Sequence, residues 1–238
     1  MAIILNSRRH LLMGAAGSLL LSASALADSH RQAAPGKTTK KTAESVPVTP
    51  TEDLMREHGV LQRILLIYEA GARRIGGGED IDPVVFTQAA ETMRDFIHDY
   101  HEKSEEELVF PRFKKAGRMV ELVEVLQVQH TAGRKLTDRI LQTAETSRGN
   151  KEQRTAMIDA MQATITLYRP HAAREDTNIF PTLRSLMTPN EFEELGETLE
   201  KTEVAKFGGD GFDKMAKRVE QIEKRIGTDD LAQVTPKN

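Results

Sequence analysis

Apolar residues repeat at steps of three and four positions through most of the chain after Thr51, and this period predicts α-helices. The first predicted helix follows Thr49 and Pro50, an N-cap and a first-turn proline, and ends at three consecutive glycines. No strand-like alternation of useful length occurs in the sequence. Four long helices are predicted, over residues 51–75, 84–110, 120–146 and 151–187.

Proline and glycine mark where these helices bend or end. Pro111 is predicted to stop or kink the second helix, and Pro170 falls inside the fourth, where an uncompensated proline costs about 3 kcal/mol. A shorter helix is predicted from Pro189 and a last one over 213–226, separated by the glycine-rich stretch 207–212. Without a preceding strand or a GK[ST] sequence, those glycines favour a turn over a phosphate-binding loop.

Short connections between the long helices predict an all-α fold, an antiparallel up-down-up-down four-helix bundle with additional C-terminal helices. The expected division of the chain is a signal peptide, a flexible linker, the bundle, a helical extension and a tail. These segments cover residues 1–27, 28–50, 51–187, 188–227 and 228–238.

The N-terminal segment has the features of an export signal. Arg8 and Arg9 precede a mild apolar run, and Ala25-Leu26-Ala27 matches an A-x-A cleavage site. The paired arginines resemble a twin-arginine signal, which predicts a periplasmic protein without stable membrane insertion after signal removal. An ordinary secretory signal is the alternative, and an uncleaved anchor is disfavoured because the run is shorter than the ~20 residues that a membrane span needs.

Composition excludes several classes of function. The net charge of -3 and the pI near 6.2 give no basic field for nucleic acid. The absence of cysteine excludes disulfides, thiolate metal sites, cysteine nucleophiles and lipoprotein anchoring. Any bound metal must therefore be held by nitrogen and oxygen donors.

One eleven-residue stretch occurs twice and carries the candidate chemistry. HEKSEEELVFP begins at His101, and HAAREDTNIFP begins at His171, so each copy has a histidine, a glutamate four residues later and a closing Phe-Pro. Residues four apart lie on one face of a helix. His101 with Glu105, and His171 with Glu175, are thus predicted to form two half-sites for a metal.

Two further histidines fall at the same depth of the predicted bundle. Counted from one end at 1.5 Å per residue, His58 and His130 on the other two helices lie within roughly 5 Å of the level of the repeated pair. A single helical histidine is more often structural, but four at one level indicate convergence. The candidate ligands are His58, His101, Glu105, His130, His171 and Glu175.

Six nitrogen and oxygen donors without sulfur suit iron, manganese or zinc. Two carboxylates from different helices can each bridge two metal ions, whose charge would offset the cost of burying both acids. The neighbouring acids Glu106, Glu107 and Asp176 are expected to be ordinary solvated side chains. Phe110-Pro111 is interpreted as the end of the ligand-bearing helix rather than as part of the chemistry.

These residues resemble the hemerythrin-like, or HHE cation-binding, domain, whose pattern is His, HxxxE, His and HxxxE with Phe-Pro after each pair. The match falls on the six candidate ligands and covers about 51–187. The resemblance implies an antiparallel four-helix bundle with a non-haem di-iron centre bridged by the two glutamates. Two iron ions are therefore the expected cofactor, ahead of manganese or zinc.

The sequence also departs from the oxygen-carrying hemerythrins, which have a second histidine on the third helix and an aspartate on the fourth. Here Arg134 stands where the second imidazole would lie, and Glu175 replaces the aspartate. This weakens a role in simple reversible oxygen carriage. His98 is a candidate fifth imidazole, and Tyr168 is a candidate hydrogen-bond donor to a bound oxygen species or a packing residue.

The sequence therefore favours an exported di-iron protein that binds O2 or a related small oxidant such as peroxide or NO. Iron or redox sensing, iron storage and a peroxide-consuming, catalase-like enzyme are the alternatives, beside a metal-free structural bundle. A binding protein is favoured over an enzyme. Two other classes of metalloprotein are disfavoured. A zincin protease requires HExxH, but the stretch from His101 to Glu105 ends in glutamate. A ferritin-like site requires ExxH pairs, and none occurs at matching depths.

Overall fold

The computed structural model describes residues 48–236, in which every regular element is helical. Helix α1, Pro50–Gly76, begins at a capping box. In this box the Thr49 hydroxyl accepts from the Glu52 amide, and the Glu52 carboxylate accepts from the Thr49 amide at 2.8 Å. The predicted first helix is confirmed. The predicted signal peptide and almost all of the predicted linker lie outside the described residues.

The second long helix is not a regular α-helix. It consists of α2 (Val84–Thr92), π-helical segments η1 (Met93–Glu102) and η2 (Glu105–Val109), and α3 (Phe110–Ala116). The sequence predicted that Pro111 stops or kinks this helix. The predicted stop was wrong, because the helix continues to Ala116.

A widened turn explains how the chain continues past this proline. The Phe110 amide donates to the carbonyl of Glu105, five residues back, and Pro111 then occupies the first turn of α3. A missing amide N–H has no cost in a first turn, because that group has no intrahelical acceptor there. The structure therefore tolerates Pro111 without ending the helix.

The remaining predicted helices are confirmed with small shifts of their ends. Helix α4 spans Val120–Ala144, and α5 spans Lys151–Arg174 with Pro170 inside it. The fourth predicted helix continues as π-helical η3 (Glu175–Ile179), α6 (Phe180–Leu183) and the 3₁₀ turn η4 (Arg184–Leu186). The C-terminal elements are α7 (Pro189–Phe207), α8 (Gly211–Ile226) and the short 3₁₀ helix η5 (Leu231–Val234).

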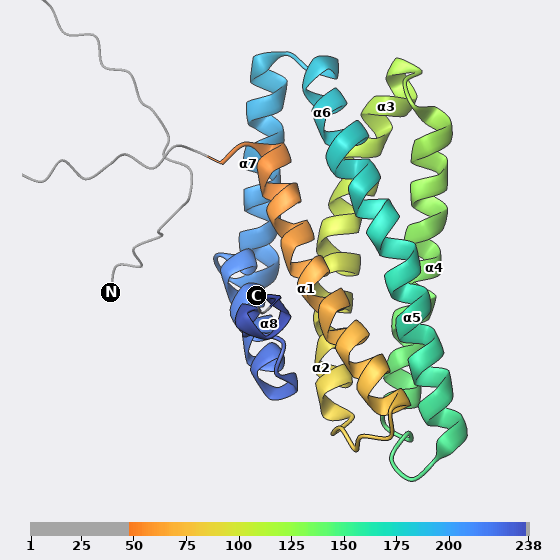
Figure 1. Cartoon of the computed structure of the whole chain (residues 1–238). Helices are drawn as coiled ribbons and strands as arrows, with labels where there is room; N and C mark the ends of the chain where they lie inside the picture. The colour runs from red at the N-terminus through yellow and green to blue at the C-terminus, as the bar shows by residue number, and fades with distance from the viewer. Residues whose placement is uncertain (1–47, 237–238) are drawn as a thin grey trace, which may run out of the picture. The chain divides into compact units, whose positions relative to one another are not determined.

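The long helices pack side by side (Figure 1). Helix α5 contacts α1 and α4, and α2 contacts α4, while α8 packs on α1 and α2. Their buried side chains form two apolar clusters. Along α1, His58 lies between Leu54 of one cluster and Leu61 of the other. A layer of buried polar residues therefore separates two apolar parts of the core.

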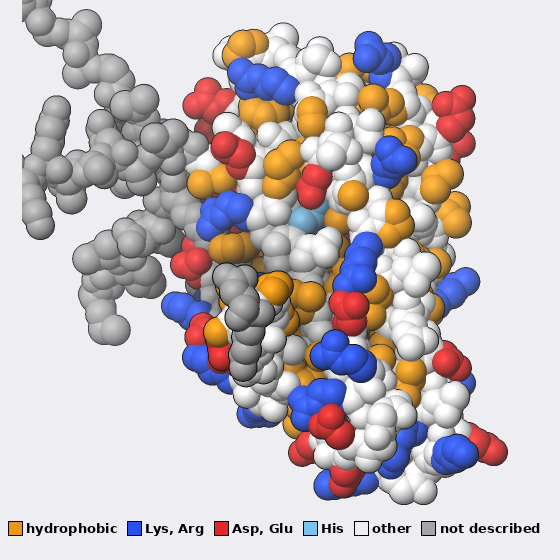
Figure 2. Space-filling model, in the orientation of Figure 1, with side chains coloured by type: hydrophobic (Ala, Val, Ile, Leu, Met, Phe, Trp, Pro, Cys, Tyr) orange, Lys and Arg blue, Asp and Glu red, His pale blue; other side chains and the backbone are white. Residues whose placement is uncertain are grey.

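Acidic and basic side chains are interspersed over the face shown in Figure 2. Within residues 48–236, no helix is both long enough and apolar enough to cross a membrane.

Glu203 of α7 is a buried acid that is not one of the six candidate ligands. It is 5% exposed, and its carboxylate accepts a hydrogen bond from the Phe212 amide at 2.7 Å. Burial raises the pKa of this carboxyl to about 7, although the Phe212 amide favours the ionised form. Because the folded-state pKa exceeds the unfolded one, the contribution of Glu203 to stability is complete below about pH 4.5 and is lost as the pH rises through about 7.

We therefore expect Glu203→Gln to raise the free energy of unfolding above pH 7 by on the order of 1–3 kcal/mol, with little change at pH 4.5. Denaturant titrations across this pH range test the expectation. Glu193→Gln on the exposed side of α7 is the matched control. A Glu203→Gln protein that is less stable than the wild type at pH 8 would contradict it.

Candidate metal centre

All six predicted ligands meet in the buried polar layer. One group of donor atoms, all within 4.8 Å of one another, comes from His58, His101, Glu105 and Glu175, and a second comes from His130, His171 and Glu175. Each of these side chains is at most 3% exposed. The sequence predicted that these residues lie at one level along the helices, and the structure places their donor atoms close together.

The four imidazoles form two pairs. In the first imidazole pair, the Nε2 atoms of His58 and His101 are 3.1 Å apart, and in the second, those of His130 and His171 are 3.2 Å apart. All four Nε2 atoms face the interior of the layer, where a metal ion would meet them.

Each glutamate lies between the two imidazole pairs. Oε2 of Glu175 is 3.3 Å from Nε2 of His58 and 3.0 Å from Nε2 of His171. Oε2 of Glu105 lies 3.7 Å from the first pair, at His101, and 3.5 Å from the second, at His130. A carboxylate in this position can contact two ions, one at each pair.

The acid that follows each candidate glutamate supports a histidine. Asp176 Oδ1 lies 2.7 Å from Nδ1 of His58, and Glu106 Oε1 lies 2.9 Å from Nδ1 of His130. The interpretation of Glu106 and Asp176 as ordinary solvated acids was wrong, whereas Glu107 is exposed as expected. A carboxylate on Nδ1 fixes the imidazole orientation and directs Nε2 to a metal.

Two further residues, one on α1 and one on α4, support histidines of other helices. Each directly precedes a candidate ligand of its own helix. Glu57 Oε2 lies 2.6 Å from Nδ1 of His101, and Gln129 Oε1 lies 2.9 Å from Nδ1 of His171. Sequence reasoning missed both residues. The available signal was their shared position, because each residue directly precedes a candidate histidine, His58 or His130.

The phenylalanine of each Phe-Pro stacks on an imidazole. Phe180 lies 5.5 Å from the His58 ring at 29°, and Phe110 lies 5.5 Å from the His130 ring at 22°, measured between centroids and planes. The Phe180 amide donates to the Glu175 carbonyl, which repeats the widened turn at Phe110. Phe-Pro is therefore part of the site's wall, and the interpretation as a helix end alone was wrong.

The electrostatics of the layer favour a bound cation. Both carboxylate oxygens of Glu105 are buried without a hydrogen-bond partner in the described chain, and the only polar groups close to the buried carboxylate of Glu175 are the imidazoles around it. Burial and the nearby Glu175 hold the pKa of Glu105 well above its usual value. Burial opposes ionisation of Glu175 as well, but His171 and His58 hold its pKa well below the usual range. Unpartnered buried carboxylates are costly, and a metal ion would neutralise them, so the donor set fits a metal.

The two histidines of the first imidazole pair have pKa values shifted in opposite directions. Burial lowers the pKa of His58, but Asp176 and Glu175 more than offset this and raise it to about 9. Burial and the neighbouring His58 lower the pKa of His101 to about 3. A metal at this pair would displace the proton held by His58.

His98 and Tyr168 join a polar network beside the ligands. Nε2 of His98 lies 2.8 Å from the Thr137 hydroxyl, and His98 belongs to none of the groups of donor atoms that could hold a metal ion within residues 48–236. The Tyr168 hydroxyl donates to Glu102 at 2.6 Å, and its ring meets His171 edge-on at 5.4 Å. Glu102 is buried beside the site.

Gly133 makes room for Tyr168, and this gives a prediction. A Cβ at Gly133 would lie 1.9 Å from the Tyr168 hydroxyl oxygen. We expect Gly133→Ala to displace the tyrosine and to lower the free energy of unfolding by about 1–3 kcal/mol. In Gly59→Ala the added methyl meets nothing within 4 Å, and we expect a gain of about 0.5–1 kcal/mol. Equal changes in the two variants, measured by denaturant unfolding, would contradict this account.

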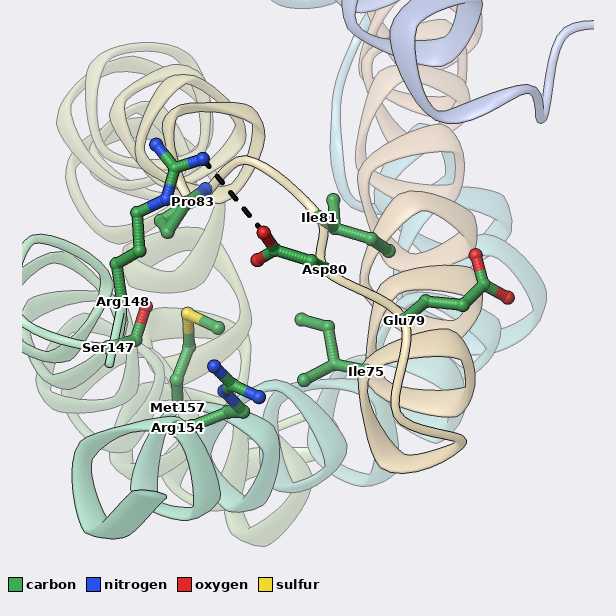
Figure 3. Close-up of a pocket in the computed structure, with 9 residues that line it drawn as sticks. All are labelled: Ile75, Glu79, Asp80, Ile81, Pro83, Ser147, Arg148, Arg154 and Met157. Carbon is green, nitrogen blue, oxygen red and sulfur yellow. Dashed lines mark ion pairs between the residues drawn. The ribbon is translucent and has the colours of Figure 1, made fainter. Parts of the chain in front are cut away.

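A pocket at one end of the helices is separate from this layer. It is lined by the loop after α1 and the connection between α4 and α5, and Asp80 and Arg148 form an ion pair there at 4.0 Å (Figure 3). Both side chains are largely exposed, so the pair contributes little to stability. None of the six candidate ligands lines this pocket.

The protein is helical, and its buried layer contains groups of histidines and glutamates that could hold a metal cation. Residues 49–183 match the model of the Hemerythrin HHE cation binding domain, and the chain belongs to this family. The resemblance noted in the sequence is thereby confirmed.

Relatives at 41% identity include a protein of Mycobacterium bovis and proteins of two Mycobacterium tuberculosis strains, each named as uncharacterized. Each alignment covers 231 residues, which is 96% of this chain and 91% of the relative. No solved structure matches the chain significantly.

Proposed function

We propose that the chain holds two non-haem iron ions, one at each imidazole pair, with Glu105 and Glu175 as shared ligands. The observation that carries this proposal is the position of the two glutamates, both fully buried and each within 4 Å of both imidazole pairs. Nitrogen and oxygen donors without sulfur suit iron. Manganese and zinc suit the same donors and are tested beside it.

We further infer an antiparallel four-helix bundle for residues 51–187, with 188–227 as an added helical extension. The short connections at 77–83, 117–119 and 145–150 support this arrangement. The contacts of α5 with α1 and α4, and of η1 with α1 and α4, support it as well. Such a bundle brings one face of each long helix to the polar layer.

The proposed ligand is O2 or a related small oxidant such as peroxide or NO. His58 with His101, and His130 with His171, would each hold one ion together with the two glutamates, and a bound iron pair would supply electrons to a small oxidant. The chain would orient the imidazoles through their Nδ1 partners, while Phe110 and Phe180 exclude water from two of them.

A peroxide-consuming enzyme is the second candidate, favoured by the Tyr168 hydroxyl and Glu102 beside His171. Anaerobic loading with Fe(II), followed by exposure to air or peroxide, separates the two. Binding predicts a visible absorption band that reverses when the gas is removed. Turnover predicts steady peroxide loss that disappears in Glu105→Ala and Glu175→Ala. A loaded protein that responds to neither O2, peroxide nor NO would contradict both.

We also propose export to the periplasm, on the strength of Arg8, Arg9 and the Ala25-Leu26-Ala27 site. Cell fractionation tests this. The expected result is mature protein in the periplasm and retention in the cytoplasm when both arginines are replaced by lysine. Equal cytoplasmic protein with and without the arginines would contradict export by the twin-arginine route.

A further inference from the structure

The two imidazole pairs are arranged alike, but their supporting residues differ in charge. In the first pair, the Nδ1 of His101 meets a carboxylate oxygen of Glu57 at 2.6 Å. At the equivalent place in the second pair, the Nδ1 of His171 meets an amide oxygen of Gln129 at 2.9 Å. A carboxylate raises the basicity of a ligating imidazole, and a neutral amide does so less.

The other two supporting acids differ in the same direction. Asp176 supports His58 at 2.7 Å, and Glu106 supports His130 at 2.9 Å. The oxygen of Glu106 that meets His130 also accepts from Arg134 at 2.8 Å. A guanidinium on the same carboxylate oxygen offsets much of its charge.

The ligating atoms lie in a dry environment, so the difference between Glu57 and Gln129 acts strongly, whereas the charges of Asp176 and Glu106, whose side chains are 37% and 26% exposed, are partly screened by water. All four imidazoles are at most 3% exposed, and Glu57 is 1% exposed. Charges interact more strongly where water is excluded. The first pair thus has two carboxylates on its Nδ1 atoms, and the second has one, which it shares with a cation.

We infer that the two metal positions differ in affinity, an inference that rests on the dinuclear site proposed above. The position at His58 and His101 binds more tightly and fills first. The weaker position at His130 and His171 is then the one whose occupancy follows the concentration of free metal. A half-loaded protein, with one ion at the first pair, is a defined state of this chain. Glu57 is a positioning residue that sets this order.

A zinc titration of the metal-free protein, followed through the ¹⁵N resonances of the imidazoles, tests the order directly. Zn(II) is diamagnetic and accepts the same donors. The first equivalent is expected to shift the Nε2 resonances of the first pair, and the second equivalent those of the second pair. If His130 and His171 respond first, or if both pairs respond in parallel, the inference is overturned.

Two opposite substitutions test the cause. Glu57→Gln gives both pairs an amide partner, and we expect it to weaken the first binding step by about 10–100-fold while leaving the second nearly unchanged. Gln129→Glu places a carboxylate on the Nδ1 of His171, as Glu57 does on that of His101, and is expected to tighten the second step. Calorimetric titration with Zn(II) measures both steps, and circular dichroism checks that each variant is folded.

The outcomes separate this inference from the proposed function. Two ions bound in both variants, with Glu57→Gln affecting the two steps equally, would overturn the order but leave the dinuclear site intact. One ion in total, or none, in the folded wild type would contradict the dinuclear site itself.

Discussion

Glu105→Gln is expected to stabilise the metal-free protein and to weaken its metal binding by more than about 100-fold, two effects of opposite sign. In the absence of metal, both oxygens of Glu105 are buried without a partner and lie near Glu175. Replacing a buried carboxyl that lacks partners by a neutral amide of the same size should raise the free energy of unfolding by about 1–3 kcal/mol. With metal, the variant lacks a ligand that both ions share.

The measurement is thermal or denaturant unfolding with and without anaerobic Fe(II). A ligand at 100 times its dissociation constant stabilises the folded state by about 2.7 kcal/mol, and the variant should lose most of this increment. Glu107→Gln, on the exposed side of the same helix, is the matched control. If Glu105→Gln lowers the stability of the metal-free protein and keeps the full response to Fe(II), Glu105 is a structural acid and not a ligand.

The gain in the metal-free variant should also depend on pH. The pKa of Glu105 is raised in the folded protein, so this group favours folding at low pH and disfavours it as the pH rises through its folded-state pKa. The difference between variant and wild type should therefore be absent below the usual carboxyl pKa of 4.5 and should grow as the pH rises above it.

Phe180→Ala is expected to cause the largest loss of stability, about 3–5 kcal/mol, because it leaves a cavity in a packed core. Phe180 is 1% exposed and belongs to the same apolar cluster as Phe110 and Phe113. Its ring also stacks on His58. We therefore expect a second effect, a weaker affinity of the first imidazole pair for metal.

Phe113→Ala distinguishes the two effects of Phe180. Phe113 is fully buried in the same cluster, so its removal should cost a similar free energy of unfolding. We expect its metal affinity to stay near that of the wild type. Zinc titrations of both variants at a temperature where each is folded provide the comparison. Equal affinities for the two variants would show that the stacked ring does not support His58.

Most of the fold could be predicted from the sequence because the hydrophobic period is strong in each long helix. The ligand set could be predicted for a related reason, since histidines and glutamates four apart share a face in any helix. Short connections then fixed the relative depth of His58 and His130. These inferences required no knowledge of which side chains touch.

The supporting residues could not be predicted in the same way. Glu57 and Gln129 reach histidines on neighbouring helices, and the rotation of those helices about their axes decides such contacts. Glu106 and Asp176 lie in acidic stretches that are typical of solvated helix faces. Only the packing shows that one acid of each stretch meets an Nδ1 atom.

The widened turns explain the misinterpretation of Phe-Pro. A proline inside a regular α-helix removes a hydrogen bond and clashes with the preceding turn, which predicts an end at Pro111. A π-type turn from Glu105 to Phe110 places this proline in a new first turn instead. Such turns occur frequently at functional sites, and here the same turn follows both candidate glutamates.

The stoichiometry of bound iron tests the central claim most directly. The full-length protein, matured in cells and purified, would be loaded with Fe(II) without oxygen, desalted and analysed for metal and protein together. We predict two iron ions per chain in the wild type and at most one in Glu105→Gln. A folded wild-type protein that retains no iron, manganese or zinc under these conditions would contradict a metal centre in this layer.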